Sequence, residues 1–361
     1  MLEADELETR GDAAGALRVI EGMPVDTMGR PFWRPERERR LRQLVSLGDA
    51  APAWVRGRWI LAQAAQSTPG DVKRAIALAV RTRGGASTLW GVDEVDAQCK
   101  VIDHDWVYRQ LVLHEYGGLA TFLRMRANSA LLSAGRGFEA WVGAPMGAYE
   151  LVNEAPAKLT WRHVGSDRLV DTVNLGGAAL CARGAHVIGR VVEADSVAVF
   201  ESPPLCVPAD VAEAVAANPA DWISALAAGC QGPHGPLLAE FVARVHHFDL
   251  LCDMPCNLRR QLMQPDDPAL RADQLGIGGN GVQYDVALVL AALAGDLDLE
   301  GEGVPAAPHV AAALLEPGTA DALESLLVTS DATALRWLGD VLAAPAGIVC
   351  ERLAARLSDV A

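Results

Sequence analysis

The sequence predicts an α+β protein that is mainly α-helical. We expect a helical N-terminal domain, a small central antiparallel β-barrel or curled sheet, and a helical C-terminal domain. Hydrophobic residues recur at helical spacing over residues 1–145, alternate over residues 146–208, and return to helical spacing over residues 209–361. The chain of 361 residues also exceeds the roughly 250–300 residues that one hydrophobic core supports, so several structural units are expected.

Amphipathic helices account for the N-terminal segment. Val72, Ile76 and Val80 fall on one stripe of a helix, and Leu41 and Leu44 repeat this spacing in the preceding segment. Pro35 stands where the first turn of that helix tolerates proline. Further helices are expected over residues 4–21, 53–66 and 104–126, the last of them kinked or split at Gly117 and Gly118.

Two stretches carry resemblances to known proteins. The segment ELETRGDAAGALRVIEG, residues 6–22, resembles the small-residue helix pairs of tetratricopeptide repeats, and GDAA recurs at 11 and 48. The phrase RPFWRPER, residues 30–37, together with residues 173–192, resembles a group of actinobacterial proteins. That resemblance covers about the first 210 residues. It implies a helical domain followed by a small β domain, and it transfers no activity.

Short alternating segments predict the central sheet. In KLTWRHV, Leu159, Trp161 and His163 alternate with polar residues, which is the period of a strand with two unlike faces. The segments 168–175, 185–192 and 196–201 are similarly short and rich in Val, and turn residues separate them. Strands connected this tightly favour a small antiparallel barrel or a strongly curled sheet. Prolines 203, 204 and 208 end it.

The C-terminal segment returns to the helical period. Helices are expected over residues 210–229, 236–254 and 282–295, followed by Ala- and Leu-rich helices to residue 361. Residues 296–308 are acidic, contain glycine and end in proline, so they predict an exposed loop.

Composition limits the classes of partner. The net charge of −15 disfavours nucleic acid, because an acidic surface repels phosphate backbones. The longest apolar run, residues 286–295, is far shorter than the ~20 residues of a membrane span, so no membrane partner is expected. Seven scattered cysteines and the lack of a basic, apolar leader indicate a soluble protein of the reducing cytoplasm.

The string GIGGNG, residues 276–281, matches the glycine pattern of a dinucleotide fingerprint. That fingerprint needs a buried strand directly before its first glycine, and the preceding DDPALRADQL is polar. We therefore interpret the string as a loop that leads into the helix at 282.

The densest group of metal-ligand residue types is His246, His247, Asp249 and Cys252. On a helix some of these residues share a face, which raises the hypothesis of a divalent transition-metal site. Against a zinc finger, the next cysteine is four residues on, at Cys256, and no second ligand pair follows at the usual distance. The alternative is that the cysteines are small buried residues and no cofactor is bound.

Three other groups of residues suggest catalysis, and each lacks a required part. DHDW at 103–106 has no upstream histidine, and HEYGG at 114–118 has glycine where a zinc-protease helix needs its second histidine. Asp103 is instead expected to cap the helix that follows. His163, Asp171 and His186 lie on neighbouring predicted strands, where convergence depends on strand order. Neither a nucleophile elbow nor a phosphate-binding loop motif occurs.

One segment concentrates positive charge. Residues 30–42 hold six arginines with Phe32 and Trp33 among them, and Glu36 and Glu38 dilute the charge. Arginine beside aromatic residues suits phosphate, carboxylate or RNA contacts, and a solvated helix face is the alternative. The residues expected to bind a ligand or partner are Trp33, Arg34, Arg37 and Arg40.

Taken together, these patterns favour a non-catalytic protein-interaction or scaffold protein in which paired helices present a groove to a protein partner. Metal-dependent hydrolysis through the residues at 246–252 is the alternative. A second alternative is binding of a phospholigand or nucleic acid through the arginines at 30–42.

Overall fold

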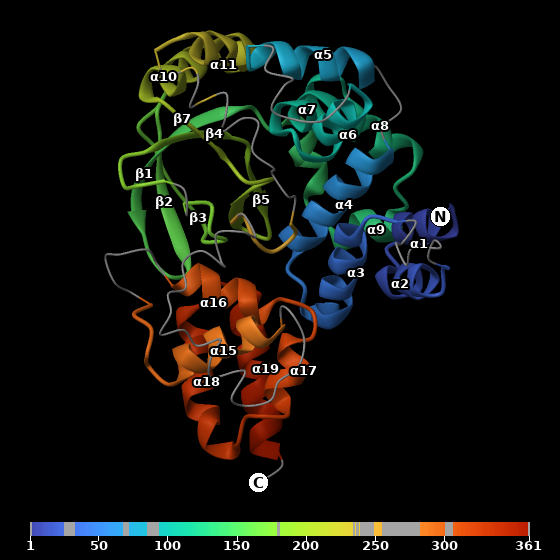
Figure 1. Cartoon of the computed structure of the whole chain (residues 1–361), viewed down its shortest axis with the longest axis vertical. Helices are drawn as coiled ribbons and strands as arrows, with labels where there is room; N and C mark the ends of the chain where they lie inside the picture. Colours follow the sequence, from blue (N-terminus) through green and yellow to red (C-terminus); the bar gives the residue numbers. More distant parts are fainter. Residues whose placement is uncertain are drawn as a thin grey trace.

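The computed structural model describes residues 2–24, 33–67, 72–84, 94–178, 181–233, 235, 238, 249–254, 282–299 and 306–359. These residues are mainly helical, with one small antiparallel sheet. In Figure 1 the sheet lies opposite the N-terminal helices, and the C-terminal helices form a separate group at the other end of the molecule from α5 and α11.

Local signals in the sequence explain the first helices. Gly11 has a φ of +82°, which lets the chain turn between α1 and α2, and Asp12 then caps α2 by accepting a hydrogen bond from Gly15 N at 2.7 Å. Pro35 occupies the first turn of α3. The elements are α1 (Leu2–Thr9), α2 (Ala13–Glu21), α3 (Pro35–Leu47), η1 (Gly48–Ala50), α4 (Ala53–Ser67) and α5 (Val72–Thr82).

The expected helix at 104–126 is divided into several pieces. A π-helix, η3, occupies Leu111–Glu115, and Gly117, with a φ of +68°, separates it from α8, so the expected split at this glycine is confirmed. The cap predicted at Asp103 is wrong: α6 continues to His104, and Asp105 accepts the capping bond from Tyr108 N at 2.7 Å. The elements are α6 (Glu94–His104), α7 (Trp106–Gln110), η3, α8 (Gly118–Met125), α9 (Ser129–Ala134) and η4 (Phe138–Gly143).

The central sheet is open, so the predicted β-barrel is wrong. Its strand order is β3-β2-β1-β4-β7, and the edge strands β3 and β7 do not pair with each other. β5 and β6 form a separate two-stranded sheet, in which Val191 pairs with Phe200. The strands are β1 (Gly147–Glu154), β2 (Lys158–His163), β3 (Leu169–Val173), β4 (His186–Gly189), β5 (Val191–Ala194), β6 (Val197–Phe200) and β7 (Leu205–Val207).

The sheet stays open because its two faces pack against different layers. Ala148 and Ile188 face a core shared with helices α7, α10 and α11. The next residues along the same strands, Tyr149 and Val187, face a second core with Trp161 and Phe200 of β6. Both faces are therefore covered without closure. The helices that follow the sheet are α10 (Ala209–Ala217), η5 (Pro219–Asp221) and α11 (Trp222–Gln231).

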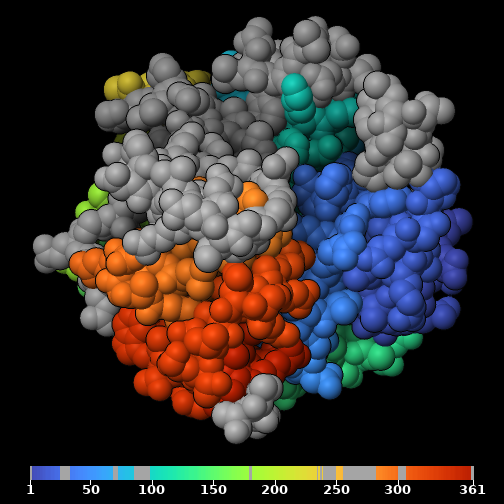
Figure 2. Space-filling model, turned by 60° about the horizontal axis from the view of Figure 1, so that its bottom comes forward, coloured from blue at the N-terminus to red at the C-terminus, as the bar shows by residue number. Residues whose placement is uncertain are grey.

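The C-terminal helices pack against the N-terminal ones. One continuous hydrophobic cluster runs from Ala4 to Ala354, and Arg352 Nη1 donates to Ser46 O at 2.8 Å. Figure 2 shows the C-terminal helices, in orange and red, directly against the blue N-terminal residues. The division into domains at 1–145, 146–208 and 209–361 stays a prediction. The helices are α15 (Val282–Leu293), α16 (Ala307–Leu314), α17 (Thr319–Glu324), η6 (Thr329–Asp331), α18 (Ala332–Val341) and α19 (Ala346–Asp359).

Two other expectations concern residues 236–254 and 276–281. The helix predicted over 236–254 is wrong at its end, because residues 249–254 form no helix; most of its remainder lies outside the described residues. GIGGNG, at 276–281, also lies outside them, and α15 begins directly after it at Val282. No helix among the described residues has both the length and the apolar character needed to cross a bilayer.

Candidate functional site

A cavity of about 660 Å³ lies among α3, α4, α6 and α7. We call it the arginine pocket. Its size falls within the roughly 300–1,000 Å³ of small-molecule sites. The described residues that line it are Asp5, Trp33, Arg34, Pro35, Glu36, Arg37, Arg40, Leu61, Ala62, Ala65, Gln66, Ile102, Asp103, His104, Tyr108, Arg109, Val112 and Leu113.

Helix α3 brings the predicted ligand-binding residues to this pocket. Arg34 stands at its N-cap, and Arg37 and Arg40 follow at intervals of three residues, which places their side chains on one face. Trp33 precedes the helix and lines the same cavity. The structure thus brings together all four residues that the sequence selected for ligand or partner binding.

Arg37 is neutralised inside the protein. The residue is 4% exposed, and its Nε donates to Glu8 Oε1 at 2.6 Å. Its Nη2 donates to Asp5 Oδ1 at 2.6 Å, and Trp59 Nε1 satisfies the other oxygen of Glu8 at 2.9 Å. This arginine therefore connects α3 to α1 and serves mainly to hold the wall of the pocket in place.

The residues at the start of α3 are also held by neighbours. Arg34 forms an ion pair with Asp103 of α6 at 2.5 Å, and Trp33 Nε1 donates to Glu38 Oε2 at 2.9 Å. Asp103 is therefore part of the pocket wall instead of a helix cap. These contacts fix the indole and one guanidinium beside the cavity.

Arg40 has a different environment. Its side chain is 9% exposed, and among the described residues it makes neither a hydrogen bond nor an ion pair. Burial lowers the pKa of Arg40, the carboxylates of Glu8, Asp249 and Glu36 act in the opposite direction, and the nearby Arg37 lowers the pKa further. A buried guanidinium thus borders the cavity with its donors available.

Arg109 adds a second cation, half-buried, that sequence reasoning missed. It lies on the short helix α7, which the Asp105 cap positions, and it lines the same cavity. Burial lowers the pKa of Arg109 to about 10, and repulsion from Arg40 contributes to this shift. No local pattern marks Arg109, because its meeting with α3 is a long-range contact.

The rest of the pocket wall is mixed, because Asp5, Glu36 and Asp103 contribute carboxylates and the other side chains are mostly apolar. Helix α4 contributes Leu61, Ala62 and Ala65, and the π-helix contributes Val112 and Leu113. Tyr108 and His104 border the cavity from α7 and α6, and Gln66 from α4. The pocket therefore combines charged groups of both signs with an apolar and aromatic surface.

A buried polar network lies behind the π-helix. His114 Nε2 contacts Glu201 Oε2 at 2.7 Å, and Gln110 Nε2 donates to Glu201 Oε1 at 2.6 Å. Arg190 Nε donates to Gln110 Oε1 at 2.9 Å, and its Nη2 donates to Glu115 Oε1 at 2.7 Å. The histidine and glutamate of HEYGG thus contact protein partners. Burial raises the pKa of Glu201, but His114, Arg190 and Gln110 outweigh it and lower the pKa to about 2.

The residues of the predicted metal site are only partly described. Asp249 Oδ1 accepts from Leu251 N at 2.9 Å, and its Oδ2 pairs with Arg39 at 2.7 Å. Cys252 Sγ donates to Met254 O at 3.7 Å. His246 and His247 lie outside the described residues. No group of three or more His, Cys, Asp or Glu among the described residues is placed to hold a metal ion.

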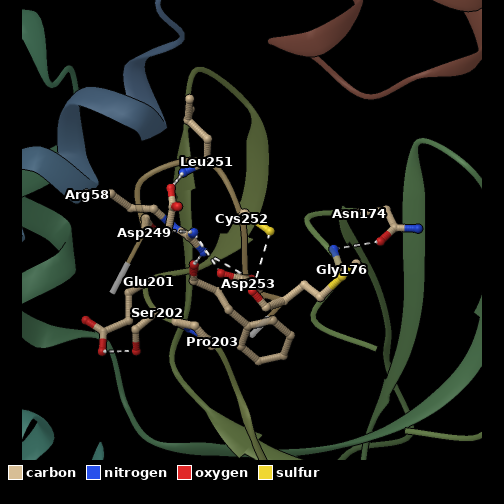
Figure 3. Close-up of polar contacts among 12 residues, drawn as sticks. Arg58, Asn174, Gly176, Glu201, Ser202, Pro203, Asp249, Leu251, Cys252 and Asp253 are labelled. Carbon is tan, nitrogen blue, oxygen red and sulfur yellow. Dashed lines mark hydrogen bonds and ion pairs between the residues drawn. The ribbon is translucent and has the colours of Figure 1, made fainter. Parts of the chain in front are cut away.

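The segment 249–254 is clamped to α4 (Figure 3). Arg58 Nη1 and Nη2 donate to Asp253 Oδ1 and Oδ2 at 2.8 and 3.2 Å, and Nη2 also donates to Phe200 O at 2.5 Å. Figure 3 shows Arg58 reaching between the carboxylates of Asp249 and Asp253. With these partners, the two carboxylates and Arg58 hold the segment in position.

His163, Asp171 and His186 do not converge. His186 on β4 and Asp171 on β3 are separated by β1 and β2, and neighbouring strands lie about 4.8 Å apart. Asp171 accepts bonds from Lys158 and Thr160 at 2.7 Å each, and His163 Nδ1 contacts Ser166 Oγ at 2.9 Å. These residues are therefore ordinary polar residues of the sheet.

Comparison with known proteins gives no further guide to the site: no family model matches the chain, and neither does any curated protein or solved structure.

Proposed function

We propose that this protein binds a small anionic ligand in the arginine pocket. The single observation that carries the proposal is Arg40, a buried guanidinium that borders a ligand-sized cavity and has no hydrogen bond or ion pair among the described residues. Of the sequence-based alternatives, binding of a phospholigand is the one that this geometry supports.

The energetic argument concerns the burial of charge. A buried ion costs several kcal/mol unless a partner compensates it, and a guanidinium offers five N–H donors arranged to match carboxylate or phosphate oxygens. Arg109 increases the cost because it places a second cation beside Arg40. An anion in the pocket offsets the cost at Arg40 and is also attracted by the charge of Arg109.

The start of α3 supports the same proposal. Residues 33–37 line the cavity, and no side chain caps the helix N-terminus. Helix N-termini favour anions because their first N–H groups lack partners within the helix. The dipole of this 13-residue helix therefore adds to the attraction of Arg40 and Arg109.

Inorganic phosphate is the first probe, with Arg40→Met as the variant and Arg42→Met as its matched control. Arg42 lies on the same helix, pairs with Glu21 at 2.7 Å and Glu38 at 2.9 Å, and is exposed. The melting temperature is measured against phosphate concentration, with sodium chloride at equal ionic strength as the reference. Because a ligand that binds only the folded state raises the melting temperature, phosphate is expected to stabilise the wild type and R42M.

R40M is expected to lose at least about tenfold in phosphate affinity, equivalent to about 1.4 kcal/mol. Without phosphate it should be as stable as the wild type or more so, because a buried unpaired charge is replaced by an apolar side chain of similar length. Equal phosphate responses in the wild type and R40M, measured by the same melting curves, would overturn the proposal.

The two other sequence hypotheses remain predictions. A protein-interaction or scaffold role stays open to co-purification experiments from the native host. Metal-dependent hydrolysis through His246, His247, Asp249 and Cys252 is tested by metal analysis of purified protein: stoichiometric metal that is lost in His246→Ala supports it. Nucleic-acid binding through the arginines at 30–42 would give a salt-sensitive mobility shift.

We also propose a cytoplasmic location. The six described cysteines are free thiols. Scattered cysteines that do not follow a disulfide framework are typical of a reducing compartment.

A further inference from the structure

The arginine pocket is larger than a simple anion needs. Its apolar part therefore indicates a ligand that carries an apolar body besides its anionic group. Its volume is about 660 Å³, and one side is formed by Leu61, Ala62 and Ala65 of α4. The π-helix adds Val112 and Leu113. Inorganic phosphate or a small dicarboxylate would leave this surface against water, whereas a ligand with an apolar body would cover it.

Aromatic side chains indicate the shape of that body. Trp33 and Tyr108 both line the cavity, and Trp33 is fixed by its hydrogen bond to Glu38 at 2.9 Å. Ala62 and Ala65 lie three residues apart on α4, and their short side chains leave space in the cavity beside this helix. Flat rings stack on aromatic side chains, and a wall of small residues accommodates a ring better than a branched chain.

A polar group on the same wall favours a heteroaromatic ring. Gln66 lines the cavity beside Ala65 and is exposed, so its amide is accessible to a ligand. A glutamine amide presents one donor and one acceptor side by side, which is the pattern that pairs with the edge of a nucleobase. A sugar without a base would leave the apolar side chains of α4 and the π-helix uncovered.

We propose that the ligand is a nucleoside monophosphate, or a phosphate monoester that carries a similar flat heteroaromatic ring. Arg40 and Arg109 bind the phosphate, and the ring lies in the part of the pocket lined by Trp33, Ala65 and Tyr108. This inference rests on the proposed anion-binding function and adds the class of ligand.

Isothermal titration calorimetry tests the inference with five probes: adenosine 5′-monophosphate, ribose 5-phosphate, adenosine, inorganic phosphate and benzoate. The nucleotide is expected to bind at least about tenfold more tightly than ribose 5-phosphate, because stacking of one base contributes this much or more. It should also bind more tightly than adenosine, which lacks the phosphate, and more tightly than benzoate.

Two variants separate the two parts of the ligand. Ala65→Leu fills the apolar part at a position exposed to the cavity, so it should weaken the nucleotide about tenfold and leave inorganic phosphate unchanged. Arg40→Met should weaken the binding of both the nucleotide and inorganic phosphate, and Arg42→Met should weaken the binding of neither. Equal affinities for the nucleotide and ribose 5-phosphate would overturn the inference and leave anion binding intact. Tighter binding of benzoate would overturn the phosphate assignment, and phosphate binding that R40M leaves unchanged would overturn the proposed function itself.

Discussion

Arg37 and Arg40 lie one turn apart on α3 and both line the arginine pocket, but among the described residues only Arg37 is held by carboxylates. Arg37 pairs with Asp5 and Glu8, which both belong to α1. The same helix face therefore carries a structural arginine and an arginine with donors available for a ligand.

Removal of Arg37 is expected to destabilise the protein, in contrast to removal of Arg40. Arg37→Met leaves Glu8 buried without its cation, which costs about 3–5 kcal/mol for a buried pair broken on one side. The double variant Arg37→Met with Glu8→Gln should recover much of this loss, since the neutral amide can still accept from Trp59. Urea unfolding measures the free energy of unfolding of each variant. Equal losses of stability in R37M and R40M would contradict the assignment of a structural role to Arg37 alone.

Glu201 should contribute to the acid stability of the protein. Burial raises its pKa, yet His114, Arg190 and Gln110 lower it to about 2 from an ordinary value of 4.5. A carboxyl whose folded pKa is lowered stabilises the folded state above its unfolded pKa and loses this contribution as the pH falls toward 2. The contribution is on the order of 3 kcal/mol.

Glu201→Gln should therefore be less stable at neutral pH and should lose less stability than the wild type between pH 5 and 2. Glu213→Gln, at an exposed position of α10, serves as the control and should follow the wild type. The measurement is the urea midpoint at each pH. If the urea midpoint of E201Q falls with pH as steeply as that of the wild type between pH 5 and 2, the network does not hold Glu201 ionised.

The clamp at Arg58 should determine the order of residues 249–254. Asp253→Asn leaves a fully buried guanidinium without its carboxylate and is expected to cost about 3–5 kcal/mol. Amide hydrogen exchange at Leu251, whose N–H donates to Asp249, should accelerate. Asp171→Asn removes a partner from an exposed pair with Lys158 and should cost less than about 1 kcal/mol. Unchanged exchange in D253N would refute the clamp.

Gly57 gives a test of core packing. A Cβ at this position would lie 2.7 Å from Trp141 Cη2 and 3.1 Å from Phe138 Cδ2. In an exposed helix, Gly→Ala stabilises the fold by about 0.5–1 kcal/mol. At Gly57 the overpacking should outweigh this gain and destabilise the fold by about 1–3 kcal/mol. Gly143→Ala, which meets no atom within 4 Å, should change stability by less than about 0.5 kcal/mol. Thermal unfolding compares the two, and a stabilised G57A would show that the rings can shift.

Local patterns were enough to predict much of the secondary structure. The stripe of Val72, Ile76 and Val80, the proline at 35 and the alternation around Trp161 each act within a few residues. The spacing of Arg34, Arg37 and Arg40 likewise followed from the chain alone. Placement of the cap failed by two residues, at Asp103 instead of Asp105, because both aspartates precede the same helix and only the course of α6 separates them.

By itself the sequence determined which residues share a helix face or a strand face, since these relationships depend on short-range periodicity. Tertiary structure alone decided that β3 and β7 do not pair with each other, that Glu8 reaches Arg37, and that Arg109 lies near Arg40 at the pocket. These outcomes depend on contacts between residues far apart in the chain, where burial and charge pairing are settled by which elements pack together and not by the residues next to them.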